Sequence, residues 1–290
     1  MKLMVLDGNS ILNRAYYGIR PLTNREGLYT HAVFGFLTTL LRLKEEERPD
    51  ALCVTFDLHA PTFRHKADEA YKATRKPMPE ELRMQVPVLK EVLDTLNIPR
   101  YEMEGWEADD LIGTISRKCE AAGWDCVVVT GDKDSLQLIT DHTKVKLVST
   151  RMGQTTTKDM TPETFREQYG FEPIHMIDLK ALMGDASDNI PGVPGVGDGF
   201  AAKWINQYGG LEQIIEHADE ISGKKGEALR ENIEQVKLNR SVNALVRDLD
   251  LGVSVSDLTF GQVDAGQLDD LFTKLEFGVR TKNRVLKTFN

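Results

Sequence analysis

"KLMVLDGNS" (residues 2–10) is an apolar run that ends in an aspartate and then gives way to small polar residues. The pattern recurs in "ALCVTFD" (51–57) and "CVVVTGDKD" (126–134). Short runs rich in Val, Leu, Ile and Met are typical of the buried strands of a parallel sheet. The predicted strands are residues 2–6, 51–56 and 126–130.

Segments with helical spacing separate these strands. Residues 31–47 carry apolar side chains three and four positions apart, and 107–121 begins with acids, which stabilise a helix N-terminus. A further strand over 144–148 and a hairpin partner near 154–157 follow. This alternation predicts an α/β fold, with a mainly parallel sheet flanked by helices.

The pattern changes after about residue 160, where strand-like runs stop and helical segments punctuated by glycine and proline begin. We expect an α/β core over 1–160 and a helical region over 161–290. Between 59 and 83, "HAPTFRHKADEAYKATRKPMPEELR" is basic and broken by prolines, with few periodic apolar residues. This segment predicts an excursion from the sheet.

Composition limits the class of protein. A hydrophobic fraction of 41% in 290 residues suffices for a well-filled core. No apolar run reaches the ~20 residues of a membrane helix, so the expected location is the cytoplasm, with no membrane partner. Cys53, Cys119 and Cys126 form no C-x-x-C pair and the histidines are scattered, so neither disulfides nor a zinc site is expected.

Acidic residues gather where the predicted strands end. Parallel neighbours bring their carboxyl ends to one edge of a sheet, so acids at these ends should meet. Two further motifs, "EGWEADDL" and "GDASDN", each contain acids three positions apart. The candidate metal ligands are Asp7, Asp57, Glu107, Asp109, Asp110, Asp132, Asp134, Asp185 and Asp188.

Each acid alone has a simpler explanation as a turn former or a helix cap. Together, however, they repel one another unless raised pKa values or bound cations relieve the cost. Because the set lacks His and Cys, Mg²⁺ or Mn²⁺ is the expected cation. Two such ions ~4 Å apart activate a water in phosphodiester hydrolysis. The net charge of −9 therefore does not exclude a polyanionic substrate.

Basic residues concentrate in the excursion. They are Arg64, His65, Lys66, Lys72, Arg75, Lys76 and Arg83. A run of charge is often a solvated helix face, but the prolines and the position directly after Asp57 favour nucleic-acid binding. Lys72 and Arg75 lie three apart and can meet one phosphate, and Tyr71 can stack on a base. Arg64 is expected among the DNA contacts.

"PGVPGVG" (191–197) precedes a predicted helix. Its glycines allow close approach of the backbone to a phosphate or ion, and the helix N-terminus follows. Such elements hold duplex backbones without reading sequence, whereas the alternative is a plain helix-turn-helix connection. The predicted element covers about 184–220, with Gly195 and Gly197 at the DNA.

In order, "VLDGNS", "VTFD", "FRHKADEAYKATRKPMPEEL", "GWEADDLIG", "TGDKDSLQL" and "LMGDASDNIPGVPGVG" resemble the 5′ nuclease domain of bacterial DNA polymerase I, within the flap endonuclease family. The resemblance implies a PIN-like core, a helical arch over about 59–83, and a helix-three-turn-helix element that holds duplex DNA with a monovalent cation such as K⁺. It also implies removal of 5′ flaps and RNA primers during replication and repair, leaving a 5′ phosphate.

All nine acids match family metal-site positions. The resemblance assigns Lys72 and Arg75 to catalytic contact with the scissile phosphate, Tyr71 to the arch, and Arg14 to the 5′ end of the substrate. The chain departs from the family at 198–200, where "DGF" replaces an acid, a lysine and a threonine. Lys203, one turn later, is the expected substitute for the missing lysine.

Two other functions stay open. One is a branched-DNA-binding module without cleavage, and the other is a PIN-type ribonuclease acting on single-stranded RNA. The expected partners are branched or 5′-flap duplex DNA and RNA–DNA hybrids, bound by a monomer. A stand-alone nuclease and one part of a longer polymerase both fit the sequence.

Overall fold

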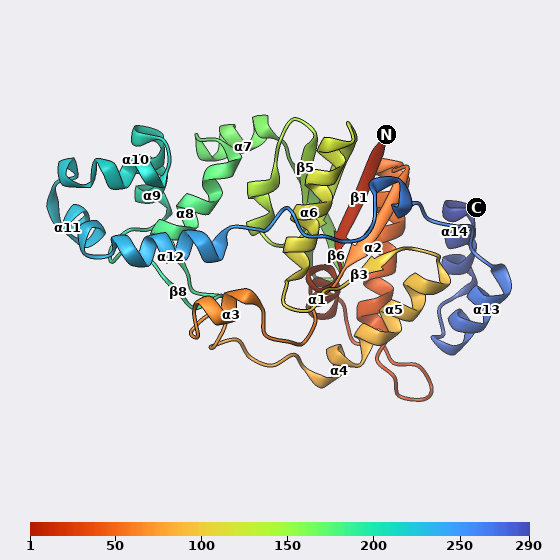
Figure 1. Ribbon diagram of the computed structural model, residues 1–290. Coiled ribbons are helices and arrows are strands. Elements are labelled where there is room, and N and C mark those ends of the chain that lie inside the picture. Colours follow the sequence, from red (N-terminus) through yellow and green to blue (C-terminus); the bar gives the residue numbers. More distant parts are fainter.

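A six-stranded sheet forms the centre of the computed structural model, which describes residues 1–290 (Figure 1). The strand order is β3-β2-β1-β4-β5-β6, and all neighbours are parallel except the antiparallel pair β5 and β6. The strands are β1 (Lys2–Asp7), β2 (Ala51–Thr55), β3 (Arg100–Tyr101), β4 (Asp125–Thr130), β5 (Thr143–Arg151) and β6 (Gln154–Met160). The predicted strands and the hairpin are therefore confirmed.

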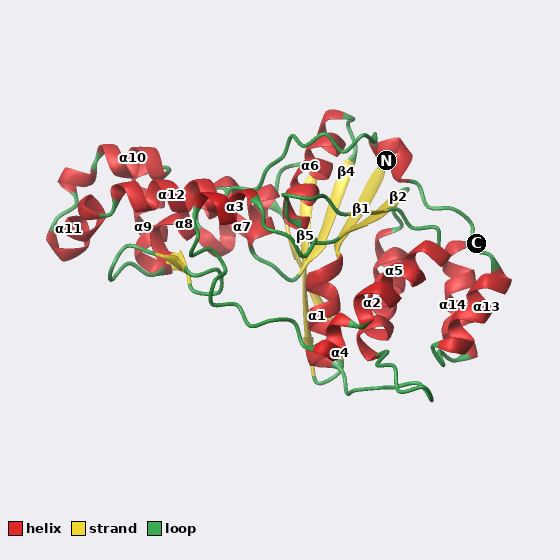
Figure 2. Ribbon diagram, turned by 60° about the horizontal axis from the view of Figure 1, so that its bottom comes forward, coloured by secondary structure: helices red, strands yellow, loops and turns green.

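Helices cover both faces of this sheet. They are α1 (Gly8–Gly18), α2 (His31–Glu47), α5 (Gln85–Thr95) and α6 (Ala108–Ala121). Side chains alternate along β1, so that Leu3 and Val5 join the core on the side of α6, whereas Met4 and Leu6 join the core beneath α1 and α2. Figure 2 shows α6 on one side of the sheet and α1, α2 and α5 on the other.

Beyond β6 the chain is mostly helical. The elements are α7 (Pro162–Tyr169), α8 (Met176–Met183), α9 (Asp198–Tyr208), α10 (Leu211–Glu216), α11 (Gly223–Glu231) and α12 (Ile233–Asn243). The expectation that strands stop near residue 160 is wrong in one detail. Two short strands, β7 (Gly184–Asp185) and β8 (Ile190–Pro191), pair antiparallel and form a small hairpin between α8 and α9.

After α12 the chain returns to the α/β core. Val255 and Leu258 enter the same apolar cluster as Leu3 on β1. Helices α13 (Ala265–Lys274) and α14 (Val279–Phe289) then pack against α5 and α2 (Figure 1). The predicted division at residue 160 remains a prediction, but the last segment of the chain packs on the first.

The arch, residues 59–83, crosses the carboxyl ends of the strands. It contains the five-residue helix α3 (Phe63–Ala67), then turns, then α4 (Glu80–Arg83), so most of its length is not helical. The β7–β8 hairpin holds it, since the Lys72 N–H donates to the Asp188 carbonyl and the Asn189 side-chain amide donates to the Ala70 carbonyl, each at 2.8 Å. No helix in the chain is both long and apolar enough to cross a membrane.

Candidate active site

Four carboxylates without a basic partner lie at the carboxyl edge of the sheet. They are Asp7, Asp57, Asp109 and Asp132, and none forms a salt bridge. We call them the unpaired group. Asp7 is fixed at the end of β1 because its carboxylate accepts from the Ser10 N–H and from the Thr130 hydroxyl, each at 2.9 Å. Asp57 accepts from the Ala108 N–H at 2.8 Å, which joins β2 to the first turn of α6.

Burial and then repulsion raise the pKa values of three members of the unpaired group, Asp7, Asp57 and Asp109. Burial raises the pKa of Asp7 to about 7, with further contributions from Asp57 and Asp132. Burial and then the charge of Asp7 raise the pKa of Asp109 well above its usual range. A divalent cation relieves such repulsion, and an all-oxygen donor set suits a hard cation. The residues present therefore fit Mg²⁺ or Mn²⁺.

Asp134, Asp185 and Asp188 form a second cluster, in which one oxygen of each lies within 4.8 Å of the others. We call it the paired group because cations already balance it. Lys180 on α8 pairs with Asp134 and lies 2.7 Å from Asp185, while Arg75 of the arch lies 2.5 Å from Asp188. Although burial acts in the opposite direction, Lys180 holds the pKa of Asp185 at about 2.

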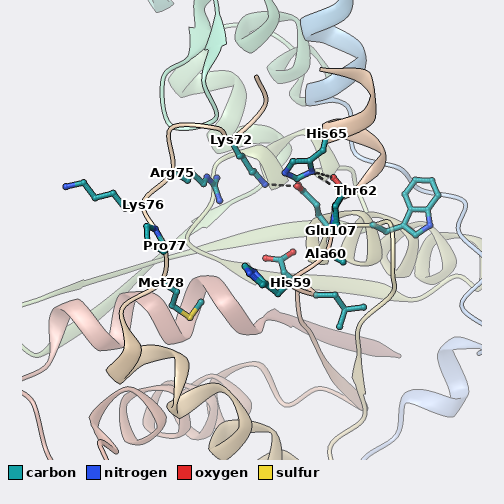
Figure 3. Close-up of a pocket in the computed structure, with 14 residues that line it drawn as sticks. His59, Ala60, Thr62, His65, Lys72, Arg75, Lys76, Pro77, Met78 and Glu107 are labelled. Carbon is teal, nitrogen blue, oxygen red and sulfur yellow. Dashed lines mark hydrogen bonds and ion pairs between the residues drawn. The ribbon is translucent and has the colours of Figure 1, made fainter. Parts of the chain in front are cut away.

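A hollow of about 500 Å³ opens beneath the arch. Figure 3 shows Lys72 and Arg75 directed into it from the arch, with Glu107 on the opposite side. The Lys72 ammonium lies 2.7 Å from the Glu107 carboxylate. His65, one of the basic residues noted in the sequence, also lines the hollow, as does His59, which the sequence interpretation did not include. Cationic groups of the arch thus face the acidic edge of the sheet.

Asp110 does not join either group, so its prediction as a metal ligand is corrected. It is fully buried, and both of its oxygens accept from Arg64 at 2.7 Å. The same carboxylate also accepts from the N–H groups of Glu107 and Val246. The three-residue spacing of Glu107 and Asp110 reflects this cap at the start of α6, which leaves Asp110 no free oxygen for an ion.

Arg64 and Tyr71 also differ from their prediction as DNA contacts. Arg64 is 1% exposed, and its guanidinium is held by Asp110 and the carbonyls of Val242 and Ala244. Tyr71 is 4% exposed, and its hydroxyl donates to Glu107 at 3.1 Å. Both side chains anchor the arch to the core and present no surface to a base or a phosphate.

Arg14 lies on the other side of the acidic edge. Its guanidinium donates to the Gly131 carbonyl, and it lines a hollow of about 420 Å³ together with Asp132, Lys180 and Asp185. The sequence does not predict the role of Lys180, because a single lysine on an apolar helix gives no indication of which acids it will pair with. The signal available was its position one turn before the acidic motif "GDASDN".

The Gly-rich connection between β8 and α9 is compact. A side chain on Gly192 would meet the backbone of Met183 at 2.2 Å, so only glycine fits there. Gly195 has φ +76°, which favours glycine, and Gly197 is the residue before α9. Lys203 is exposed on α9. The backbone of this connection is thus exposed at Gly195 and Gly197, next to the N-terminus of α9.

The family comparison covers most of the chain. Residues 2–170 match the model of the 5′-3′ exonuclease N-terminal resolvase-like domain. Residues 171–266 match the model of the 5′-3′ exonuclease C-terminal SAM fold. The two matches meet between α7 and α8, close to the change in pattern that the sequence presents.

Among curated proteins, DNA polymerase I of Bacillus subtilis (strain 168) is 42% identical over 277 residues, covering 95% of this chain and 31% of that protein. DNA polymerase I of Mycobacterium bovis is 42% identical over 280 residues, covering 96% of this chain and 31% of that protein. The chain thus spans about a third of the length of these relatives.

Two solved structures have a similar fold. The bacteriophage T5 D15 protein co-crystallized with metal ions has a TM-score of 0.70 at 20% identity, covering 100% of both chains. The catalytic core of Rad2 in complex with a DNA substrate has a TM-score of 0.65 at 14% identity, covering 100% of this chain and 92% of the other.

Proposed function

Because this chain belongs to the 5′-3′ exonuclease family, we propose that it is a divalent-metal-dependent 5′ nuclease that cuts branched duplex DNA at 5′ ends and 5′ flaps. The observation that carries the proposal is the unpaired group of carboxylates at the sheet edge, beneath a basic arch. RNA primers in RNA–DNA hybrids are further substrates in this proposal, and the active form is a monomer.

The two groups of acids have complementary roles in the proposal. The unpaired group, with Glu107 beside it, holds one Mg²⁺ or Mn²⁺ ion, and the paired group holds a second. When bound, these ions supply an activated water and stabilise the leaving oxygen. The metal ions bound in the T5 D15 crystals are consistent with this chemistry. In the paired group, Lys180 exchanges its carboxylate partners for substrate phosphate.

The arch and the Gly-rich connection position the substrate. Lys72 and Arg75 face the acidic edge, where their charges offset those of the scissile phosphate. Arg14 receives the 5′ end in the neighbouring hollow. The backbone at Gly195 and Gly197 holds the duplex with help from K⁺, and the DNA bound to Rad2 is consistent with a duplex partner.

The decisive experiment compares two substrates. We expect purified chain with Mg²⁺ to cleave a 5′-flap DNA duplex much faster than single-stranded RNA of the same length. The Asp132→Ala variant should bind the flap duplex and leave it intact. Faster cleavage of the RNA would indicate a PIN-type ribonuclease, and binding without cleavage by the unmodified chain would indicate a branched-DNA-binding module.

Lys72→Ala tests the role of the arch. Because the Lys72 charge acts on the reacting phosphate, we expect single-turnover cleavage to slow ~10²-fold or more while the Kd for the duplex changes only a fewfold. Equal losses in rate and binding would show that Lys72 only holds the DNA. The exposed Lys158, on the β6 strand, provides a matched Lys→Ala control.

A further inference from the structure

His65 presents an unused hydrogen-bond donor to the hollow beneath the arch. Its Nδ1 accepts from the Thr62 backbone N–H at 3.1 Å and lies 2.9 Å from the Thr62 hydroxyl. A ring nitrogen that accepts a hydrogen bond carries no proton, so the neutral ring holds its proton on Nε2. Nε2 donates to no group of the chain, and it is open to the hollow that the ring lines.

The ring of His65 is held in place by two neighbours. Its contact with Thr62 completes a capping box at the start of α3. The ring of Tyr71 packs against it at a steep angle, with the two ring centres 5.3 Å apart. Tyr71 is in turn buried and bound to Glu107 through its hydroxyl. A donor on a ring that is already fixed loses little conformational freedom when it binds a ligand.

Two neighbouring spaces share the same pair of basic side chains. Lys72 and Arg75 line the hollow beneath the arch, and they also line a narrower crevice that contains members of both groups of acids. His65 lines the hollow but not the crevice. Figure 3 shows the His65 ring between Lys72 and Thr62. His65 therefore lies one step farther from the acidic edge of the sheet than Lys72 and Arg75 do.

We propose that the Nε2–H of His65 donates to the phosphate next to the scissile one in the cleaved strand, while Lys72 and Arg75 serve the scissile phosphate itself. This inference rests on the proposed function for the identity of the substrate. A hydrogen bond to an anionic oxygen is stronger than one between two neutral groups. Because the donor is uncharged, the contact adds affinity without releasing a counterion, which distinguishes it from the contacts of the neighbouring basic side chains.

Two substitutions separate this contact from the role of His65 in the capping box. His65→Thr keeps a side-chain acceptor for the Thr62 N–H, as Thr164 does at the start of α7, but removes the N–H donor. His65→Gln keeps an acceptor, as Gln213 does at the start of α10, and also an N–H donor. Both variants should therefore retain the Tm of the unmodified chain. The control is His142→Thr, an exposed histidine directly before β5, at the amino edge of the sheet.

The test compares an all-phosphate 5′-flap duplex with duplexes that carry a methylphosphonate, which lacks the anionic oxygen, at either neighbour of the scissile phosphate. On the all-phosphate duplex, we expect His65→Thr to lower the second-order rate constant of single-turnover cleavage in Mg²⁺ ~10-fold. It should raise the Kd in Ca²⁺ by a similar factor, with an unchanged slope of log K against log[salt]. His65→Gln should recover most of both losses.

The methylphosphonate duplexes identify the contacted phosphate. With the substitution at that position, His65→Thr and the unmodified chain should cleave at the same rate, because neither can form the hydrogen bond. If His65→Thr matches the unmodified chain on the all-phosphate duplex, or loses the same factor on every duplex, the contact is overturned and the nuclease proposal stands. If the unmodified chain binds the duplex in Ca²⁺ but fails to cleave it in Mg²⁺, the nuclease proposal fails, and the same comparison of Kd values decides the His65 contact.

Discussion

The two groups of acids lie side by side but balance their charge in different ways. The unpaired group has no cationic partner, and the pKa of Asp7 rises to about 7. The paired group contains Lys180 and Arg75, and the pKa of Asp185 falls to about 2. Both groups consist entirely of aspartates, so residue type does not explain the contrast. The difference comes from which cations the fold brings near, and it predicts different responses to mutation.

Asp109→Asn should have the largest effect, because it removes a ligand from the group that has no basic side chain paired with it. We expect flap cleavage in Mg²⁺ to fall ~10³-fold or more, measured in single turnover. Without metal, the same variant should melt at a higher temperature, since one repelling charge is gone. Asp270→Asn, an exposed acid on α13, is the control. Cleavage close to the unmodified rate would remove Asp109 from the metal site.

Arg64→Met tests the third arrangement, in which an acid is fully buried against its partner. The change leaves Asp110 charged and unpaired, so we expect the free energy of unfolding to fall by about 3–5 kcal/mol in urea titrations. Adding Asp110→Leu should recover most of the loss. A double variant that folds but no longer binds Mn²⁺ would show that Asp110 is a metal ligand after all.

Lys180→Met should make the paired group resemble the unpaired one. With the ammonium gone, the pKa of Asp185 should rise, and stability without metal should fall by about 1–2 kcal/mol. Mn²⁺ should bind this group several-fold more tightly, because it no longer competes with an internal cation. Isothermal titration with Mn²⁺ measures the effect. An unchanged affinity would mean that Lys180 does not occupy the cation position.

The smallest expected effect is that of pH on the stability of the metal-free chain. Because the pKa of Asp7 is raised in the folded state, folding retains a proton that the unfolded chain has lost, so stability falls as pH rises toward 7. Burial lowers the pKa of His31, so the unfolded chain holds a proton there that the folded chain has lost. This makes stability rise with pH up to the ordinary pKa of histidine, and it partly offsets the effect of Asp7. We expect the metal-free Tm to drop ~3–5 °C between pH 5 and 7.5.

Two additions identify the source of this drop. Mg²⁺ should remove it, because a bound cation relieves the repulsion among the anionic forms. Asp109→Asn should reduce it, because Asp7 then loses a negative neighbour. A metal-free Tm that rises steadily from pH 5 to 7.5 in the unmodified chain would contradict the raised pKa values.

The sequence predicts the core of the fold well because each strand can be identified from the apolar pattern of its own residues. Residues 126–130 and 31–47 contain enough apolar periodicity to identify a buried strand and an amphipathic helix without knowledge of their neighbours. The edge at which Asp7, Asp57 and Asp132 meet follows from parallel topology alone. The packing of α13 on α5 and of α14 on α2 has no such signal, because the residues of an amphipathic helix do not identify the helix that it packs against.

The candidate site is less predictable where a charge depends on a distant partner. Asp109 and Asp110 are adjacent in sequence, yet one faces the other carboxylates and one is buried against Arg64, which lies 46 residues away. Tyr71 likewise depends on a distant partner, since its hydroxyl donates to Glu107 and is not exposed to solvent. Sequence pattern identifies which residues can carry charge, but only tertiary structure determines which charges remain unneutralised.

The return of the chain after α12 has a mechanical consequence. The helical region is tethered to the core twice, after β6 and again after α12, and one apolar cluster runs without a break from Leu3 on β1 to Trp204 on α9 and Leu229 on α11. A single flexible linker would let the two parts rotate freely, whereas two tethers and a shared interior fix their spacing. The fold itself therefore sets the spacing between the acidic edge of the sheet and the Gly-rich connection before α9.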